Sequence, residues 1–139
     1  MYLDSSVLVK LFVREPDSEP CAAMVTGAVL VSSELAYGEL WSALLQKERS
    51  GEISRELRDR AWRDFLFRLS EDSIQLVPLE SALMRAAVET MTDVHPQVSM
   101  RTLDAIHLAT FRSLDGQYLY TVDKRMQAAA KILELPLVA

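Results

Sequence analysis

Four acidic residues occupy positions where carboxylates commonly carry chemistry. Asp4 closes a short apolar run at the start of the chain, and Asp123 follows a later apolar run by two residues. Asp104 falls in the first turn of an expected helix, and Glu39 lies at the edge of the apolar stripe of another. Ligands of open parallel sheets bind beyond the carboxyl ends of the strands, so acids placed there are candidates for a functional site.

Convergence of these carboxylates would favour a divalent metal ion. Two carboxylates about 5 Å apart repel by roughly 3 kcal/mol at an effective dielectric constant of about 20, before any cost of desolvation. A divalent cation relieves that repulsion, and a ligand set made only of oxygens suits the hard ions Mg²⁺ and Mn²⁺. Such ions polarise a phosphodiester and activate a water molecule. If the four acids meet, they indicate metal-assisted phosphodiester chemistry.

Each acid also has a purely structural interpretation. Asp4 and Asp123 each precede an expected helix, so capping of that helix explains them at least as well as metal binding does. Asp104 could stabilise the positive end of its helix, and Glu39 could lie on a solvated helix flank. Glu34 competes with Glu39, although the helix dipole explains an acid in the first turn. Position alone leaves both interpretations open.

Other polar residues lie near the acids. His107 comes one helical turn after the third acid and could orient a carboxylate or a water molecule, although a hydrogen-bonded helix histidine is the commoner role. Four basic residues follow the two strand-end acids, namely Lys10, Arg14, Lys124 and Arg125. They could contact an RNA backbone, although surface solubility is the more usual role of such side chains.

Short strands that alternate with helices must position these candidates. Apolar runs predict strands over 2–4, 29–31, 74–77 and 118–121, with a fifth candidate over 137–138. Helices are predicted over 7–13, 19–26, 54–69, 80–91, 102–114 and 124–133, with another that ends at about 49. Ser5 or Ser6 is expected to cap the first helix, and Ser32 or Ser33 the one that ends at about 49.

The order of these elements indicates the fold class. Strands separated by helices pair in parallel through right-handed crossovers. The 139 residues are 50% hydrophobic and 25% charged, which is typical of one globular domain. We therefore expect an α/β fold over residues 1–139, with a central parallel sheet of four to five short strands flanked by helices.

Composition excludes several classes of protein. The single cysteine, Cys21, cannot form an internal disulfide or a cysteine-based zinc or iron–sulfur site, which fits a reducing cytoplasm. A formal charge of −5 argues against binding nucleic acid through a simple basic patch. We expect neither a secretory signal nor a membrane span, because no apolar run approaches the roughly 20 residues needed.

Four segments together resemble one protein family. They are Tyr2–Lys10, which includes Asp4, Ser33–Leu40, which includes Glu39, Met100–Thr110, which includes Asp104, and Tyr120–Met126, which includes Asp123. In this order they are similar to the motifs of the PIN-domain family, and specifically of the VapC-type ribonuclease toxins of toxin-antitoxin pairs. The segment around Asp104 is the most specific. Residues 132–136 depart from the family, because many relatives have a glycine before the last strand.

The resemblance implies a metal-dependent endoribonuclease that hydrolyses RNA. Asp4, Glu39, Asp104 and Asp123 would bind one or two Mg²⁺ or Mn²⁺ ions as the catalytic acids, and the register of the motif favours Glu39 over its neighbour in the first turn. Hydroxyl residues would support the acids, namely Ser6 and Thr121. A homodimer and a small cognate antitoxin of the VapB type, which blocks the acidic groove, are also implied.

Two other functions are compatible with the pattern. An aspartyl phosphoryl-transfer enzyme would place a nucleophile at Asp4, but it would normally have a second acid where this chain has Ser6. A non-catalytic interaction module could share the fold, although the presence of all four acids gives no sign of lost activity. Binding of Mn²⁺ that depends on the carboxylates separates an enzyme from such a module.

Overall fold

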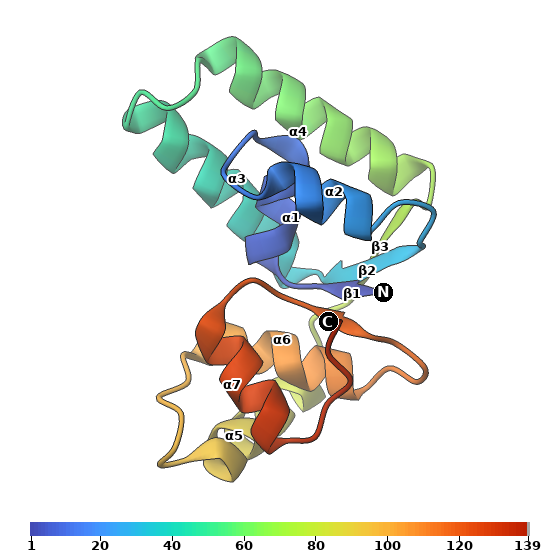
Figure 1. Cartoon of the computed structure of the whole chain (residues 1–139), viewed down its shortest axis with the longest axis vertical. Coiled ribbons are helices and arrows are strands. Elements are labelled where there is room, and N and C mark those ends of the chain that lie inside the picture. Colours follow the sequence, from blue (N-terminus) through green and yellow to red (C-terminus); the bar gives the residue numbers. More distant parts are fainter. Residues whose placement is uncertain (139) are drawn as a thin grey trace.

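The computed structural model describes residues 1–138, in which a central sheet lies between two groups of helices (Figure 1). The strands are β1 (Tyr2–Leu3), β2 (Leu30–Ser33), β3 (Ile74–Val77) and β4 (Leu119–Tyr120). The helices are α1 (Ser5–Phe12), α2 (Ser18–Met24), α3 (Leu35–Arg49), α4 (Arg55–Ser70), α5 (Ser81–Val94), α6 (Thr102–Arg112) and α7 (Lys124–Ile132). None of the helices in this described part combines the length and apolar character that a membrane crossing requires.

The sheet is parallel throughout, with the strand order β3-β2-β1-β4. The chain adds β2 and β3 on one side of β1 and then returns to place β4 on the other side. Right-handed crossovers change face when the direction of strand addition reverses. Helices α1 to α4 accordingly lie on one side of the sheet and α5 to α7 on the other (Figure 1). The carboxyl ends of β1 and β4 therefore meet at a switch point, which is where ligands bind in sheets of this type.

The two residues of β1 anchor the cores on both faces. Successive side chains of a strand point to opposite faces, and both Tyr2 and Leu3 are fully buried. Leu3 belongs to the core that includes Leu40 and Phe65, from α3 and α4. Tyr2 belongs to the core formed with α6 and α7, which includes Leu108. Because β1 is packed on both faces, the residue that follows it is held in a fixed place.

The expected α/β fold is confirmed, with four strands rather than five in the described residues. Leu137 makes a single parallel bridge to Leu119 and does not extend into a strand. The sequence predicts β3 at its observed bounds. β1 and β4 are shorter than predicted because Asp4 and Thr121 leave the strands and are joined by a hydrogen bond between their side chains.

Side chains cap the starts of α4 and α1. Ser54, the expected first residue of α4, is its N-cap instead, since its side chain accepts a hydrogen bond from a backbone N–H of the first turn. Neither Ser5 nor Ser6 caps α1. The N-cap is Asp4, whose carboxylate accepts from the N–H of Val7 at 3.2 Å. A carboxylate is a strong acceptor at this position, so the capping interpretation of Asp4 is correct and the expected serine cap is wrong.

The start of α3 also differs from the prediction. Ser32 and Ser33 both belong to β2, and the buried Ser32 hydroxyl donates to the carbonyl of Leu3 at 2.7 Å across the sheet. Ser33 does serve the helix start, because its hydroxyl accepts from the N–H of Leu35 at 3.2 Å. Pairing of β2 with β1 and β3 therefore places Ser32 in the strand, although its residue type also favours a helix cap.

Two helices present different faces or lengths from those expected. α5 continues past the predicted end at Met91, because the following turn buries Val94 completely. The spacing of Leu57, Ala61, Phe65 and Leu69 predicts one apolar face on α4, but Leu57 is 48% exposed, whereas Ala61 and Phe65 are buried. The buried face of α4 therefore does not extend to its first turn.

Phe65→Ala should destabilise the protein by about 3–5 kcal/mol, because it removes a fully buried ring from the core beneath α4. Phe67→Ala on the same helix should change the free energy of unfolding by no more than about 0.5 kcal/mol, since Phe67 is 64% exposed. Equilibrium unfolding in urea measures both. Equal losses from the two substitutions would contradict the assignment of the buried face.

Candidate active site

Asp4 lies at the end of β1 with its carboxylate enclosed by donors. The residue is 2% exposed. The Ser6 hydroxyl lies 2.7 and 2.8 Å from the two carboxylate oxygens, and the Thr121 hydroxyl donates to Oδ2 at 2.7 Å. The N–H of Val7 donates to Oδ1. The two hydroxyls expected to support an acid therefore both contact Asp4, and they tie the carboxyl end of β1 to that of β4.

The environment of Asp4 acts on its charge in two opposing ways. Burial raises the pKa of Asp4 above its ordinary value, since the charged form loses hydration. The Thr121 and Ser6 hydroxyls stabilise the carboxylate and lower the pKa, without cancelling the effect of burial. A carboxylate in this position gains more than an exposed one from a nearby cation. The same enclosure makes Asp4 a poor covalent nucleophile, because both oxygens are already hydrogen-bonded.

Glu39 is linked to α6 by a histidine. Its Oε2 lies 2.7 Å from Nε2 of His107, and Nδ1 of the same ring lies 2.9 Å from the hydroxyl of Tyr2. His107 is 1% exposed, whereas the Glu39 side chain is 20% exposed. The histidine thus has a buried hydrogen-bonded role, and its partner is one of the candidate acids. No spacing pattern reveals the Tyr2 contact, because the two residues are 105 positions apart.

Glu34, the competitor of Glu39, serves a different part of the fold. Its Oε2 accepts a hydrogen bond from the backbone N–H of Leu79 at 2.9 Å, in the connection between β3 and α5. Glu34 is exposed at the N-terminus of α3 and stabilises that connection. Glu34 therefore has a structural contact of its own, whereas Glu39 faces α6.

Asp104 and Asp123 occupy the starts of α6 and α7. Asp123 caps α7, since its Oδ1 accepts from the N–H groups of Arg125 and Met126 at 2.7 and 3.0 Å. Its own N–H donates to the Thr121 hydroxyl at 3.1 Å. Asp104 forms an ion pair with Arg125, whose nearest nitrogen lies 3.8 Å from Oδ2. The capping interpretation of Asp123 is thus correct as local structure, and it does not remove the residue from the site.

The charges around Asp104 show that these two acids are neighbours. Partial burial raises the pKa of Asp104, and the negative charge of Asp123 raises it further. Arg125 and Arg101 act in the opposite direction, but the net effect is a raised pKa. Two carboxylates at the starts of adjacent helices therefore repel each other, and a cation between them would relieve the repulsion.

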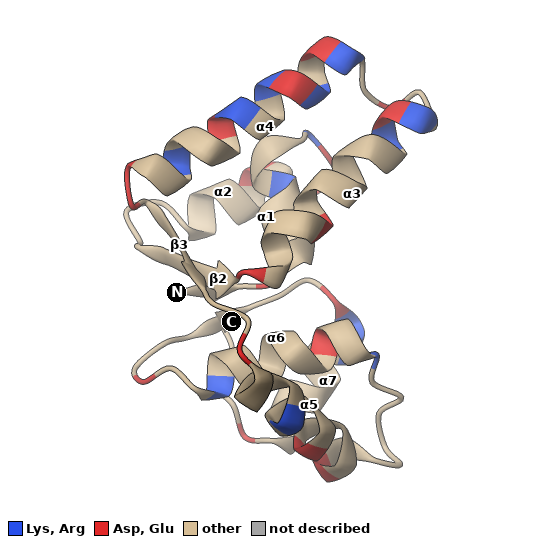
Figure 2. Cartoon of the chain, turned by 180° about the vertical axis from the view of Figure 1, so that it is seen from behind, with Lys and Arg blue, Asp and Glu red and all other residues tan. Residues whose placement is uncertain are grey.

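Acidic segments of three elements lie on one side of the molecule (Figure 2), but the candidate acids do not form a closed ligand set. Figure 2 shows acidic segments of α3, of the start of α6 and of the turn into α7 on the same side. Within residues 1–138, no three Asp, Glu, His or Cys side chains lie close enough together to hold one metal ion. Donors of the chain itself satisfy each carboxylate separately. The chemistry of the donor set nevertheless fits Mg²⁺ or Mn²⁺, because all four candidates offer carboxylate oxygens.

The four basic candidates differ in their contacts, and Lys124 is exposed at the start of α7. Lys10 donates to Glu15 at 3.0 Å, and Arg14 pairs with an exposed acid of α2, so both are engaged away from the four acids. Arg125, by contrast, faces Asp104 directly. Of the four, Arg125 has the clearest contact with a candidate acid.

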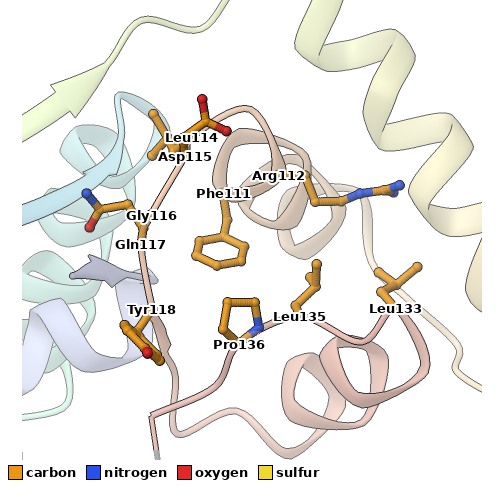
Figure 3. Close-up of a pocket in the computed structure, with 10 residues that line it drawn as sticks. All are labelled: Phe111, Arg112, Leu114, Asp115, Gly116, Gln117, Tyr118, Leu133, Leu135 and Pro136. Carbon is orange, nitrogen blue, oxygen red and sulfur yellow. The ribbon is translucent and has the colours of Figure 1, made fainter.

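A groove of about 630 Å³ lies elsewhere, between the end of α6 and the C-terminal segment (Figure 3). Its lining includes Phe111, Tyr118 and Pro136, and none of the four acids. It borders the amino end of β4, since Tyr118 immediately precedes that strand. Parallel sheets bind ligands at the opposite edge, so this groove is not the candidate active site.

Comparison with known proteins gives the family. The model of the PIN domain matches residues 1–132, and the chain therefore belongs to the PIN-domain family. Ribonuclease VapC46 of Mycobacterium tuberculosis (strain ATCC 25618 / H37Rv) is 38% identical over 143 residues, a match that covers all of this chain and 96% of the relative. Ribonuclease VapC35 of Mycobacterium tuberculosis (strain CDC 1551 / Oshkosh) is 30% identical over 148 residues, with the same coverage. Within the family, the chain groups with the VapC ribonucleases.

A solved structure agrees with the observed fold. The crystal structure of VapC20 of Mycobacterium tuberculosis, described as a toxin that cleaves the sarcin-ricin loop, matches with a TM-score of 0.72. The match covers 92% of this chain and 93% of that one, at 20% sequence identity. The arrangement of a parallel sheet between two groups of helices is thus shared over nearly the full length of both chains.

Asp104→Asn should raise the melting temperature of the protein at pH 7 in the presence of a chelator. Because the folded state raises the pKa of Asp104 above 3.8, the ionised carboxylate opposes folding. The stability contributed by protonated Asp104 is fully present below the unfolded pKa of about 4 and is lost as the pH rises through the higher folded-state pKa. The gain from the asparagine should therefore shrink as the pH falls through the folded-state pKa and should be absent below about pH 4. Melting curves across this range measure it.

Asp64→Asn is the matched control, since Asp64 is exposed on α4. It should show no comparable gain at either pH. A lower melting temperature for Asp104→Asn at pH 7 would contradict the electrostatic description of this part of the site.

Proposed function

We propose that this chain is a metal-dependent endoribonuclease that acts as the toxin of a VapBC-type toxin-antitoxin pair. The observation that carries the proposal is the buried carboxylate of Asp4 at the switch point of the sheet, held by two hydroxyls, one of which also accepts the backbone N–H of Asp123. The full-length similarity to two VapC ribonucleases supports the same activity.

The catalytic acids in this proposal are Asp4, Glu39, Asp104 and Asp123, and they would hold one or two Mg²⁺ or Mn²⁺ ions. A bound ion of this kind polarises the scissile phosphate and lowers the pKa of a water molecule for in-line attack. The all-carboxylate donor set and the mutual repulsion of Asp104 and Asp123 support this assignment.

The other side chains keep the acids in place. The Ser6 and Thr121 hydroxyls fix the orientation of the Asp4 carboxylate. Thr121 also accepts the N–H of Asp123, so one hydroxyl links two of the acids. Arg125 neutralises Asp104 in this arrangement, and in the proposal its guanidinium is available to an RNA phosphate when Asp104 binds a cation.

The proposal extends to the partners of the protein. RNA is the substrate, a small VapB-type antitoxin is the cognate partner, and the active form is a homodimer in the cytoplasm. Residues 1–139 form one PIN-like domain. The names of the relatives support the first two statements, and the single cysteine agrees with a reducing compartment.

The alternatives make different chemical demands. A non-catalytic PIN-fold module could keep Asp4 as the cap of α1, but it would have no need for the repelling carboxylates of Asp104 and Asp123 at the starts of α6 and α7. An aspartyl phosphoryl-transfer enzyme would normally have a second acid two residues after Asp4, where this chain has Ser6. The Ser6 hydroxyl instead donates to the Asp4 carboxylate, which argues against that enzyme.

The test is cleavage of total cellular RNA by the purified protein freed of any antitoxin, with Mg²⁺ or Mn²⁺ and with chelator. The wild type should give discrete products only with the metal. Asp104→Asn should reduce the rate by roughly 100-fold or more, because metal polarisation is worth several kcal/mol and each 1.4 kcal/mol is about tenfold in rate. Sequencing of the product ends identifies the cleaved RNA.

Glu34→Gln provides the matched control, since its amide oxygen can still accept the N–H of Leu79. It should cleave at the wild-type rate. Equal loss from both substitutions would show that Glu39 was wrongly preferred to Glu34. A folded wild type that neither binds Mn²⁺ nor cleaves RNA would favour the interaction module.

A further inference from the structure

A chain of hydrogen bonds runs from the middle of the sheet to the edge of the candidate site. The Tyr2 hydroxyl lies 2.9 Å from Nδ1 of His107, and Nε2 of His107 lies 2.7 Å from Oε2 of Glu39. Tyr2 and His107 are 0% and 1% exposed, whereas Glu39 is partly exposed. These hydrogen bonds therefore connect a fixed core residue to a carboxylate at the surface of the site.

Tyr2 is the rigid end of this series of hydrogen bonds. It lies on β1 between β2 and β4, and its ring makes edge contacts with Phe111 and His107 at centroid distances of 5.6 and 6.1 Å. Burial raises the pKa of Tyr2 well above its ordinary value, so the hydroxyl keeps its proton. In a neutral imidazole the hydroxyl donates to Nδ1, which leaves the hydrogen on Nε2.

That hydrogen points to the carboxylate of Glu39. A carboxylate only accepts hydrogen bonds, so the Nε2–H group of His107 is the donor. Among the described residues, the bond from His107 engages Oε2, and no protein donor engages Oε1. Glu39 is thus held at one oxygen, while the other stays available for a ligand.

We infer that His107, fixed by Tyr2, is a positioning residue for Glu39. This inference rests on the proposed function, in which Glu39 binds a divalent cation. A glutamate on a helix surface samples several rotamers, and a buried donor that selects one of them lowers the cost of binding the ion. His107 itself does not contact the ion or the RNA in this account.

Two substitutions of the same chemical type separate positioning from simple burial. The amide of His107→Gln can reach the place of Nε2 and donate to Glu39. The amide of His107→Asn is shorter and reaches only the place of Nδ1, near Tyr2. Both keep a polar amide within α6, so they differ in whether Glu39 keeps its donor.

The experiment is titration of each purified full-length variant with Mn²⁺ by calorimetry, after circular dichroism has verified the fold. His107→Gln should bind Mn²⁺ with an affinity near that of the wild type. His107→Asn should bind about 10–100-fold more weakly, which is the usual effect of removing an outer hydrogen-bond partner of a metal ligand. Thr90→Val, which removes a buried hydroxyl of α5, should leave the affinity unchanged.

A double-mutant cycle tests whether the effect passes through Glu39. In a Glu39→Gln background, His107→Asn should cause no further loss of Mn²⁺ affinity. Additive losses, or equal affinities of the asparagine and glutamine variants, would overturn the inference while leaving the metal site intact. Absence of Mn²⁺ binding by the wild type would overturn both this inference and the proposed metal site, so the two failures are distinguishable.

Discussion

The hydrogen bonds from Ser6 and Thr121 to the buried carboxylate of Asp4 are the interaction on which the site depends. They join the carboxyl ends of β1 and β4, the two strands between which the direction of strand addition reverses. Thr121 also binds the backbone of Asp123, so the same hydroxyl sets where α7 begins. Because β1 is buried on both faces, Asp4 has little freedom, and the acids of the other elements are placed relative to it.

The electrostatic balance of the site explains why an acidic protein can be proposed as a nuclease. With the chain alone, each acid is satisfied by a local donor: hydroxyls for Asp4, an imidazole for Glu39, a guanidinium for Asp104 and helix N–H groups for Asp123. Burial and like charge still leave the pKa values of Asp4 and Asp104 raised. Added positive charge at this edge of the sheet would therefore stabilise the folded protein, even though its net charge is negative.

Local sequence patterns predicted most helices and strands, but they could not predict contacts between residues that are distant in sequence. The bounds of β3 follow from an apolar run of a few positions. The cap of α1 stayed ambiguous in the sequence, because Asp4 competes with two serines that are equally good by local rules. The link between Tyr2 and His107 joins residues 105 positions apart, and only packing of α6 against β1 brings them together. The family motifs indicated the four acids, whereas their separate hydrogen-bond partners required the structure.

The most direct measurement of the central claim is the anomalous scattering of Mn²⁺ in crystals of this protein, recorded at the manganese absorption edge. The account predicts a strong peak beyond the carboxyl ends of β1 and β4, with oxygens of Asp4 and at least two of the other three acids within about 2.0–2.6 Å, the range for hard divalent cations. A peak bound only by other residues, or none in a crystal soaked at saturating Mn²⁺, would contradict the claim that these carboxylates form a metal-dependent active site.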